Sequence, residues 1–312
     1  MVGIDDIVIT GLGCVTPIGI GLEALQQSLL AGRCGIRRLY KIDDGQQTTF
    51  YGATVDDFNG KLYVRPRKAL KVMSREVQMS YASAHLAWQE SALADASVDP
   101  DRIGVVWGSE VIPGDEDEFT GAIRASAQDG VMDFPTWGRI FAKEMYPLWM
   151  LRNLPNMPAC HVGIAVDARG PNNTIASEEV SSLLALFEAA MIIERGQADV
   201  MIVGSVGGRV SPTRLGFRLH EFYDQHPYDP HTADLPRSDP FGPRRHGIVP
   251  AEGAGAIILE RRRHAVARGA KIWGQLQGQA SRCHQPESKY GGSRVAIASA
   301  ARAAMRAAGV EP

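Results

Sequence analysis

The chain has 312 residues, of which 45% are hydrophobic and 22% charged, and its 33 Lys+Arg and 35 Asp+Glu give a formal net charge of −2. This size and composition are typical of a globular protein with a full hydrophobic core and argue against a disordered or fibrous chain. The near-neutral charge argues against nucleic acid or an anionic membrane surface as a partner.

The cysteines are scattered, without CxxC spacing, at Cys14, Cys34, Cys160 and Cys283. This pattern favours a reducing cytoplasm over a secreted disulfide scaffold. The opening MVGIDDIVIT carries acids where a signal peptide has basic residues, and no apolar run is long enough to span a bilayer, so we expect a cytoplasmic protein. The dispersed histidines show no helical H-x-x-x-H pair, so no metal site is predicted.

The first elements read as strand, loop and helix. Asp6 to Thr10 predicts a buried strand ended by the glycines of Gly11-Leu12-Gly13, and leucines then recur at helical spacing. GLG could open a dinucleotide-binding loop, but Thr16 occupies the place of its third glycine, so we do not favour this interpretation. A helical pattern over 68–95 and a strand at Ile103 to Trp107 continue the alternation, which favours an α/β sandwich.

An irregular, aromatic-rich excursion from the sheet is predicted over 109–155. The most regular segment follows: a Gly-Pro turn at 170, a strand around Asn173 to Ala176, a helix over 178–195 and a strand at Asp199 to Val203.

Ser177 is expected to cap this helix, with Glu178 and Glu179 in its first turn, where the helix dipole favours anions. Its predicted buried face consists of Val180, Leu183, Leu184, Phe187 and Met191. A glycine-rich turn into a strand is predicted over 247–260, and an alanine-rich helix over 293–308.

Four segments, in order, resemble the β-ketoacyl-acyl-carrier-protein synthases, the condensing enzymes of fatty-acid and polyketide synthesis. They are IVITGLGCVTPIG with the later LLAGRCGI, NMPACHVGIAVDARGPNNT, GQADVMIVGSVGGRVSP and PFGPRRHGIVPAEGAGAIILE. The resemblance implies a thiolase-like αβαβα layered sandwich with its first half complete and its second half truncated. The expected domains are a ketosynthase-like N-terminal half, 1–260, and the beginning of the C-terminal half, 261–312.

In this family the tenth position of the Gly-Pro-Asn block is the nucleophilic cysteine, and counting from Gly170 reaches Glu179. Counting back from Gly196, at the end of the same helix, reaches the same residue. Three interpretations of Glu179 stay open: a supplement to the helix N-terminus, a group that does chemistry, or a group that lines the tunnel of a partner complex. Cys160 as a displaced nucleophile and His246 as a catalytic residue are disfavoured, as is a nucleophilic serine beside Glu179.

The resemblance therefore implies a β-ketoacyl synthase-like protein of fatty-acid or polyketide biosynthesis, condensation-deficient, that works as a chain-length-factor-like partner subunit. The alternative is an active acyltransferase-family enzyme, either a malonyl-carrier decarboxylase or an atypical ketosynthase, so whether the chain is itself an enzyme stays open. The implied partners are acyl carrier protein and a homodimer or heterodimer mate. No cofactor is expected apart from the phosphopantetheine of the carrier.

Overall fold

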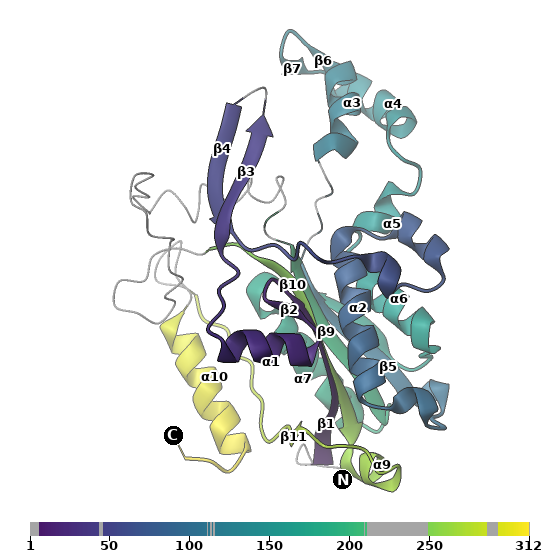
Figure 1. Ribbon diagram of the computed structural model, residues 1–312, viewed down its shortest axis with the longest axis vertical. Coiled ribbons are helices and arrows are strands. Elements are labelled where there is room, and N and C mark those ends of the chain that lie inside the picture. The colour runs from purple at the N-terminus through teal and green to yellow at the C-terminus, as the bar shows by residue number, and fades with distance from the viewer. Residues whose placement is uncertain are drawn as a thin grey trace.

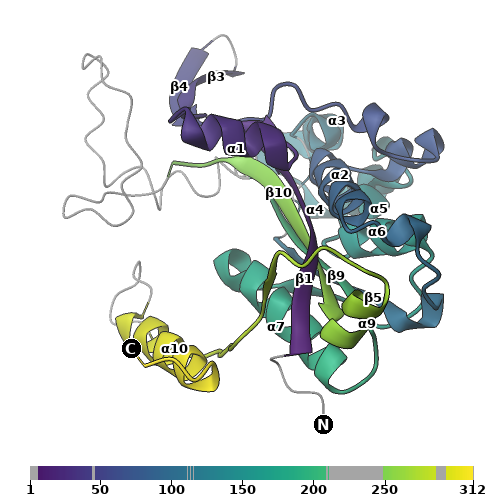
Figure 2. The same ribbon diagram turned by 60° about the horizontal axis from the view of Figure 1, so that its bottom comes forward.

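The structure of the chain is a computed structural model (Figure 1). The described residues are 6–43, 46–110, 112, 114, 116–208, 210, 249–285 and 293–311. They form one mixed sheet with helices on both faces, and two projections leave this layered body at the same end (Figures 1 and 2).

The main sheet has seven strands in the order β11-β1-β10-β9-β5-β8, with β2 paired to the end of β1. β5 runs parallel to both β8 and β9, whereas β10 runs antiparallel to β9 and β1. The strand bounds are β1 Ile7–Thr16, β2 Gly19–Ile20, β5 Ile103–Ser109, β8 Asn172–Ala176, β9 Val200–Gly208, β10 Glu252–Arg261 and β11 Gly274–Gln275. The strands predicted near residues 103, 173, 199 and 255 are thus confirmed.

The helices lie between the strands in sequence, as the alternation predicted. Their bounds are α1 Leu22–Leu30, α2 Arg75–Glu90, α3 Glu116–Ser126, α4 Phe134–Glu144, α5 Trp149–Asn153, α6 Met157–Val166, α7 Ser181–Glu194, α9 Arg262–Ala267 and α10 Arg294–Ala307. The predicted C-terminal helix is confirmed as α10, which Ser293 caps by accepting a hydrogen bond from the backbone N–H of Ala296. None of the helices in the described ranges is long and apolar enough to cross a membrane.

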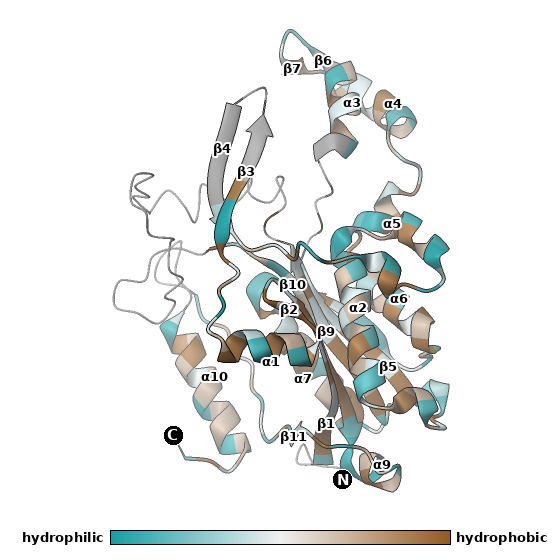
Figure 3. Ribbon diagram, viewed as in Figure 1, coloured by the Kyte–Doolittle hydropathy of each residue, from teal (hydrophilic) through white to brown (hydrophobic). Residues whose placement is uncertain are grey.

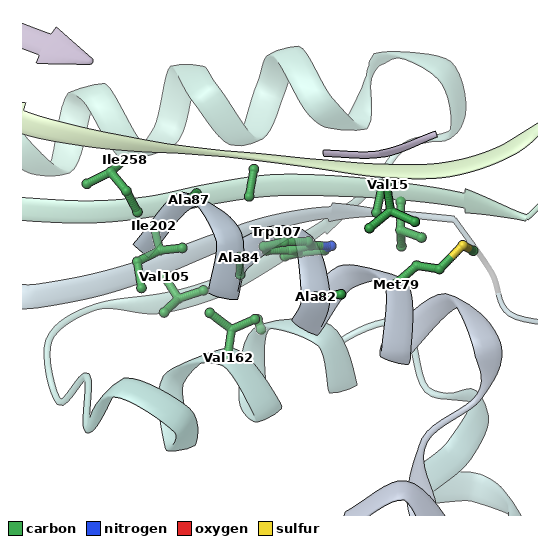
Figure 4. Packing of buried hydrophobic residues seen from close by; sticks show 14 of the residues in the cluster. Val15, Met79, Ala82, Ala84, Ala87, Val105, Trp107, Val162, Ile202 and Ile258 are labelled. Carbon is green, nitrogen blue, oxygen red and sulfur yellow. The ribbon is translucent and has the colours of Figure 1, made fainter. Parts of the chain in front are cut away.

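Two apolar layers hold the sheet between its helices, and Figure 3 shows the apolar residues concentrated in the central strands and the helices on them. One layer lies under α2 and α6, where Trp107 is fully buried beside Ala84 and Val105 (Figure 4). The other lies under α7 on the opposite face and includes Val106 and Met201. Because neighbouring residues of a strand point to opposite faces, β5 and β9 supply both layers.

The glycines at 11 and 13 do not end the first strand, contrary to the prediction. β1 continues to Thr16, and Gly11 and Gly13 lie where the backbone of α2 comes closest to it. A Cβ on Gly13 would lie 2.1 Å from the carbonyl oxygen of Ser83, and one on Gly11 would lie 2.3 Å from that of Ala87. Glycine there lets the backbones of helix and strand approach each other closely.

The predicted excursion leaves the sheet after β5 and forms an arm of α3, α4, α5 and the short hairpin β6 Ala127–Gln128 with β7 Val131–Met132 (Figure 1). The arm has an aromatic core of its own around Trp149, whose ring meets Phe119 edge to face at 5.1 Å. Glu118 accepts hydrogen bonds from Trp149 Nε1 at 2.8 Å and from Arg152 Nη1 at 2.6 Å. The second projection is the hairpin of β3 Arg37–Asp43 and β4 Gln46–Gly52.

Candidate active site

A hollow of about 830 Å³ lies on the face of the sheet opposite α2. Its floor is formed by β1, β9 and β10, and its walls include Leu22 and Leu25 of α1 and Leu183 and Leu186 of α7. The floor is made of small residues, among them Gly207 and Gly255, whose Cβ positions face open space. The hollow is therefore broad, has few large side chains on its floor and is mainly apolar.

Glu179 lies at the rim of this hollow, in the turn that joins β8 to α7. Residues Glu178–Val180 form a single 3₁₀ turn, and Glu178 has a φ of 51°, in the left-handed region. Such a conformation is uncommon outside glycine, asparagine and aspartate and costs about 1–3 kcal/mol. The tight turn predicted between strand and helix is thus confirmed, and it places both glutamates at the carboxyl end of β8.

Ser181, rather than Ser177, organises this turn. The side chain of Ser177 makes no capping hydrogen bond, so the predicted cap is wrong. Instead the Ser177 backbone N–H donates to Ser181 Oγ at 2.8 Å, and the Ser181 hydroxyl lies 2.7 Å from the carbonyl of Glu178 and 3.2 Å from that of Ser109. Because Ser181 is buried and bonded within the turn, it braces the backbone that carries Glu179 and is not placed to act as a nucleophile.

Three carboxyl groups meet along one edge of the hollow. Glu178 and Glu179 are exposed to solvent, whereas Glu110, which follows the end of β5, is only 8% exposed. These glutamates lie at the carboxyl ends of β5 and β8, on the side of the hollow next to the turn into α7.

None of the residues predicted to form the buried face of α7 is fully buried, so that part of the prediction is wrong. Val180 is 50% and Leu183 68% exposed, while Leu184, Phe187 and Met191 are half-buried. The residues that pack on the sheet are instead mostly small, and they are Ser181, Ala185, Ala189, Ala190, Ile192 and Ile193. At the start of α7 only a small residue fits, because the helix lies against the Gly108 backbone. A Cβ on Gly108 would be 2.7 Å from the Ser181 carbonyl.

The cysteine that lines the hollow is Cys14 of β1, which the sequence prediction missed. Its side chain is half-buried, and burial raises the pKa of its thiol, which a hydrogen bond with the Gly21 backbone offsets only in part. Cys160, by contrast, lies on α6, which packs on the other face of the sheet, in keeping with the expectation that it is not the nucleophile. The alternation of side chains along a longer β1 would have revealed Cys14.

Two other predictions concern this site. His246 lies outside the described residues. Across the described ranges, no group of three or more His, Cys, Asp or Glu side chains is arranged to hold a metal ion. The candidate site is therefore an apolar hollow with glutamates at the carboxyl ends of β5 and β8 and no thiol in the turn into α7.

Known proteins share this arrangement of elements. The family described as beta-ketoacyl synthase, N-terminal domain, matches residues 5–265. The 3-oxoacyl-[acyl-carrier-protein] synthase 2 of Synechocystis is 29% identical over 278 residues, which are 89% of this chain and 62% of that protein. The corresponding synthase of Vibrio cholerae is 29% identical over 308 residues, which are 97% of this chain and 70% of that protein.

Solved structures agree on the fold. A beta-ketoacyl synthase from Burkholderia phymatum superposes with a TM-score of 0.77 at 23% identity, covering 98% of this chain and 71% of that one. The ishigamide ketosynthase/chain length factor superposes with a TM-score of 0.74 at 23% identity, covering 98% and 70%. The fold is therefore the thiolase-like fold of the ketosynthases, and the chain spans about 62–71% of the length of these proteins. On the family match, the chain belongs to the beta-ketoacyl synthases and contains their N-terminal domain.

Proposed function

We propose that this chain belongs to a cytoplasmic ketosynthase-like subunit of fatty-acid or polyketide biosynthesis that binds acyl groups on a carrier protein but does not condense them. In this proposal it works beside an active synthase, as a chain-length factor does. The observation that carries the proposal is Glu179, in the turn from β8 into α7 at the rim of the apolar hollow, at the position where the sequence resemblance expects the nucleophilic cysteine.

The chemistry of the turn supports a loss of condensation. A cysteine at a helix N-terminus is a good nucleophile, because backbone N–H groups and the helix dipole stabilise its thiolate. A carboxylate at the same place is equally well stabilised, but it attacks a thioester weakly, and the mixed anhydride it would form is readily reversed. Covalent loading of an acyl chain through Glu179 is therefore not expected.

Cys14 is a poor substitute for the missing thiol. It lies within a strand rather than at a helix N-terminus, and burial raises the pKa of its thiol, so little of it is thiolate near neutral pH. Among the described residues, the hollow thus keeps an apolar surface of the kind that binds acyl chains, without an activated thiol at the turn into α7.

The partner in this proposal is an acyl carrier protein, and an exposed basic segment is the surface we propose for it. This segment, residues 60–72, carries five exposed cations, Lys61, Arg65, Arg67, Lys68 and Lys71. None of them forms an ion pair with a described carboxylate. They would attract the phosphate of a phosphopantetheine arm and acidic residues around it. A type II polyketide synthase acyl-carrier protein has been seen in complex with its ketosynthase, whose fold this chain shares with a TM-score of 0.65.

The second candidate is a decarboxylase of malonyl-carrier substrates or an atypical ketosynthase. Glu179 disfavours it, because a glutamate at this position, unlike a glutamine, adds a charge close to which the malonyl carboxylate would have to lie. A neutral acyl chain meets no such repulsion. We therefore place decarboxylation second.

The test is acyl transfer to the full-length gene product. Purified protein incubated with radiolabelled acyl-carrier protein should take up no stable label, whereas the Glu179→Cys variant should gain uptake if the rest of the site is retained. Glu178→Cys is the matched control, since its side chain leaves the backbone one residue earlier, and it should stay unlabelled.

Co-expression with a cysteine-containing synthase from the same source is the second arm. A stable pair whose products differ in chain length from those of the synthase alone is the expected result. Stoichiometric acylation of the unmodified protein, or condensation by it alone, would refute the proposal.

A further inference from the structure

The basic segment of residues 60–72 is anchored by Val64, which is fully buried in an apolar cluster with Val77 and Tyr81 of α2, and a histidine lies near each of its ends. At its beginning, the ring of Tyr63 meets His85 of α2 edge to face at 6.5 Å, and the ring of Tyr81, one turn earlier in α2, stacks with the same imidazole at 6.4 Å. Tyr81 also fixes the neighbouring backbone, since its hydroxyl donates to the Arg65 carbonyl at 3.2 Å. His85 is thus half-buried and in ring contact with the segment.

At the other end of the segment, the ring of His161 of α6 lies close enough to the backbone of Val72 for the two to interact. Its Nε2 is buried and has no partner. A neutral imidazole tolerates this arrangement, because an unused acceptor is less costly than a buried N–H without an acceptor. Protonation would put an N–H on Nε2 and bury it unpaired, which disfavours the docked position of the segment.

A positive charge disfavours protonation of His85. Arg65 is the charged group that acts on this ring, and the segment carries four further cations. The other titratable groups facing His85 are the phenols of Tyr63 and Tyr81, and no described carboxylate lies within ion-pairing distance of either histidine. A proton on either ring would therefore add positive charge beneath an already basic surface, without a counter-charge.

We infer that the basic segment is a pH-sensitive docking element, which neutral His85 and His161 hold in place and which loosens when they are protonated. At neutral pH the five cations are displayed on a fixed backbone. In mild acid the parts of the segment next to the two rings loosen and its cations lose their arrangement. The consequence for carrier binding rests on the proposed function, whereas the loosening itself does not.

The pKa shifts agree in sign with this geometry. Burial, and then the charge of Arg65, lower the pKa of His85, and burial lowers that of His161 against the opposing effect of the Val72 backbone. A histidine with a lowered pKa favours the docked state above its ordinary pKa of about 6.5, and this preference is lost progressively as the pH falls below that value. Each histidine can change the docking equilibrium by up to about tenfold per pH unit.

Hydrogen exchange of the full chain, followed by mass spectrometry and corrected for intrinsic rates, tests the inference without any partner. Between about pH 7.5 and 5.5, protection of peptides over 60–73 should fall roughly tenfold or more, while β5 and β9 stay protected. The double variant His85→Phe, His161→Asn should remove this pH dependence, since neither new side chain titrates and asparagine keeps a donor for Val72. His284→Asn, at an exposed site away from the segment, should leave it unchanged.

NMR titration of the unmodified protein gives an independent readout that needs no variant. Both histidine resonances should titrate below about pH 6.5. Titration of both at or above that value would overturn the inference, as would pH-independent protection of the segment. Because neither measurement uses a carrier protein, failure here leaves the proposed function standing, and failure of acyl-carrier binding leaves this result standing.

Discussion

Replacing Gly13 by alanine tests the packing of α2 on β1 most directly. The new Cβ would lie 2.1 Å from the Ser83 carbonyl oxygen and 2.5 Å from the Ala87 backbone nitrogen. Ordinary contacts are more than 1 Å longer, and both obstacles are backbone, so α2 has to move away from the sheet and loosen the layer around Trp107. Overpacking of a core costs about 1–3 kcal/mol, and we expect the upper end of that range because no side chain can rotate aside.

Gly255 in β10 is the matched control. It pairs with Cys14 across the same strands, yet a Cβ there meets nothing within 4 Å. Gly255→Ala should leave the free energy of unfolding unchanged or raise it by about 0.4–1 kcal/mol, because alanine restricts the unfolded chain. Urea unfolding followed by tryptophan fluorescence and circular dichroism measures both variants. If Gly13→Ala unfolds within about 0.5 kcal/mol of the unmodified protein, the close contact of β1 with α2 is not what these glycines provide.

The other predictions concern buried charge and the two sides of α7. Glu260 is fully buried, accepts a hydrogen bond from Arg268 Nε at 3.0 Å and pairs with His264 Nδ1 at 2.6 Å. Glu260→Gln should therefore lower the free energy of unfolding, measured in urea titrations, by about 3–5 kcal/mol. Burial alone would raise the pKa of Glu260, but hydrogen bonds from Arg268, Thr10 and His264 lower it, and a hydrogen bond from Arg102 lowers that of Asp199. Stability from both carboxylates is therefore complete above their ordinary pKa values, the higher of which is about 4.5, and should fall as the pH drops below that value, which unfolding curves at a series of pH values will show. On α7, Leu183→Ser should change stability by less than about 0.5 kcal/mol, whereas Ala189→Leu should cost about 1–3 kcal/mol in the same assay.

Periodicity predicted the existence and order of the main elements because each is a long apolar pattern bounded by turn residues. β5 is buried along its whole length, and such a strand reads as a continuous apolar run. The pattern failed where packing depends on small size rather than on hydrophobicity. On α7 the leucines formed the more conspicuous apolar stripe, yet Ala185 and Ala189 are fully buried in the layer with Val106 and Met201.

The candidate site was only partly predictable for a similar reason. Counting residues from Gly170 located the turn that carries Glu179, because that turn is local in sequence. The approach of Glu110 to the same edge depends on β5 lying beside β8, a pairing between distant segments. Cys14 was missed because Gly11 and Gly13 were taken as the end of a strand, so the alternation that directs Cys14 into the hollow was cut short.

The pairing of β1 with β10 has a consequence for how the protein is made. Thr10 and Glu260, which bond to each other in the finished fold, are 250 positions apart, and β1 is an inner strand of the sheet. At roughly 5–20 residues per second, the ribosome needs some tens of seconds to deliver the partner of a strand that emerged almost first. During that interval the apolar residues of β1 have no sheet to join. Nascent chains that end before β10 should therefore be held by chaperones or degraded, and folding should become possible only when the Glu252–Arg261 strand has left the exit tunnel.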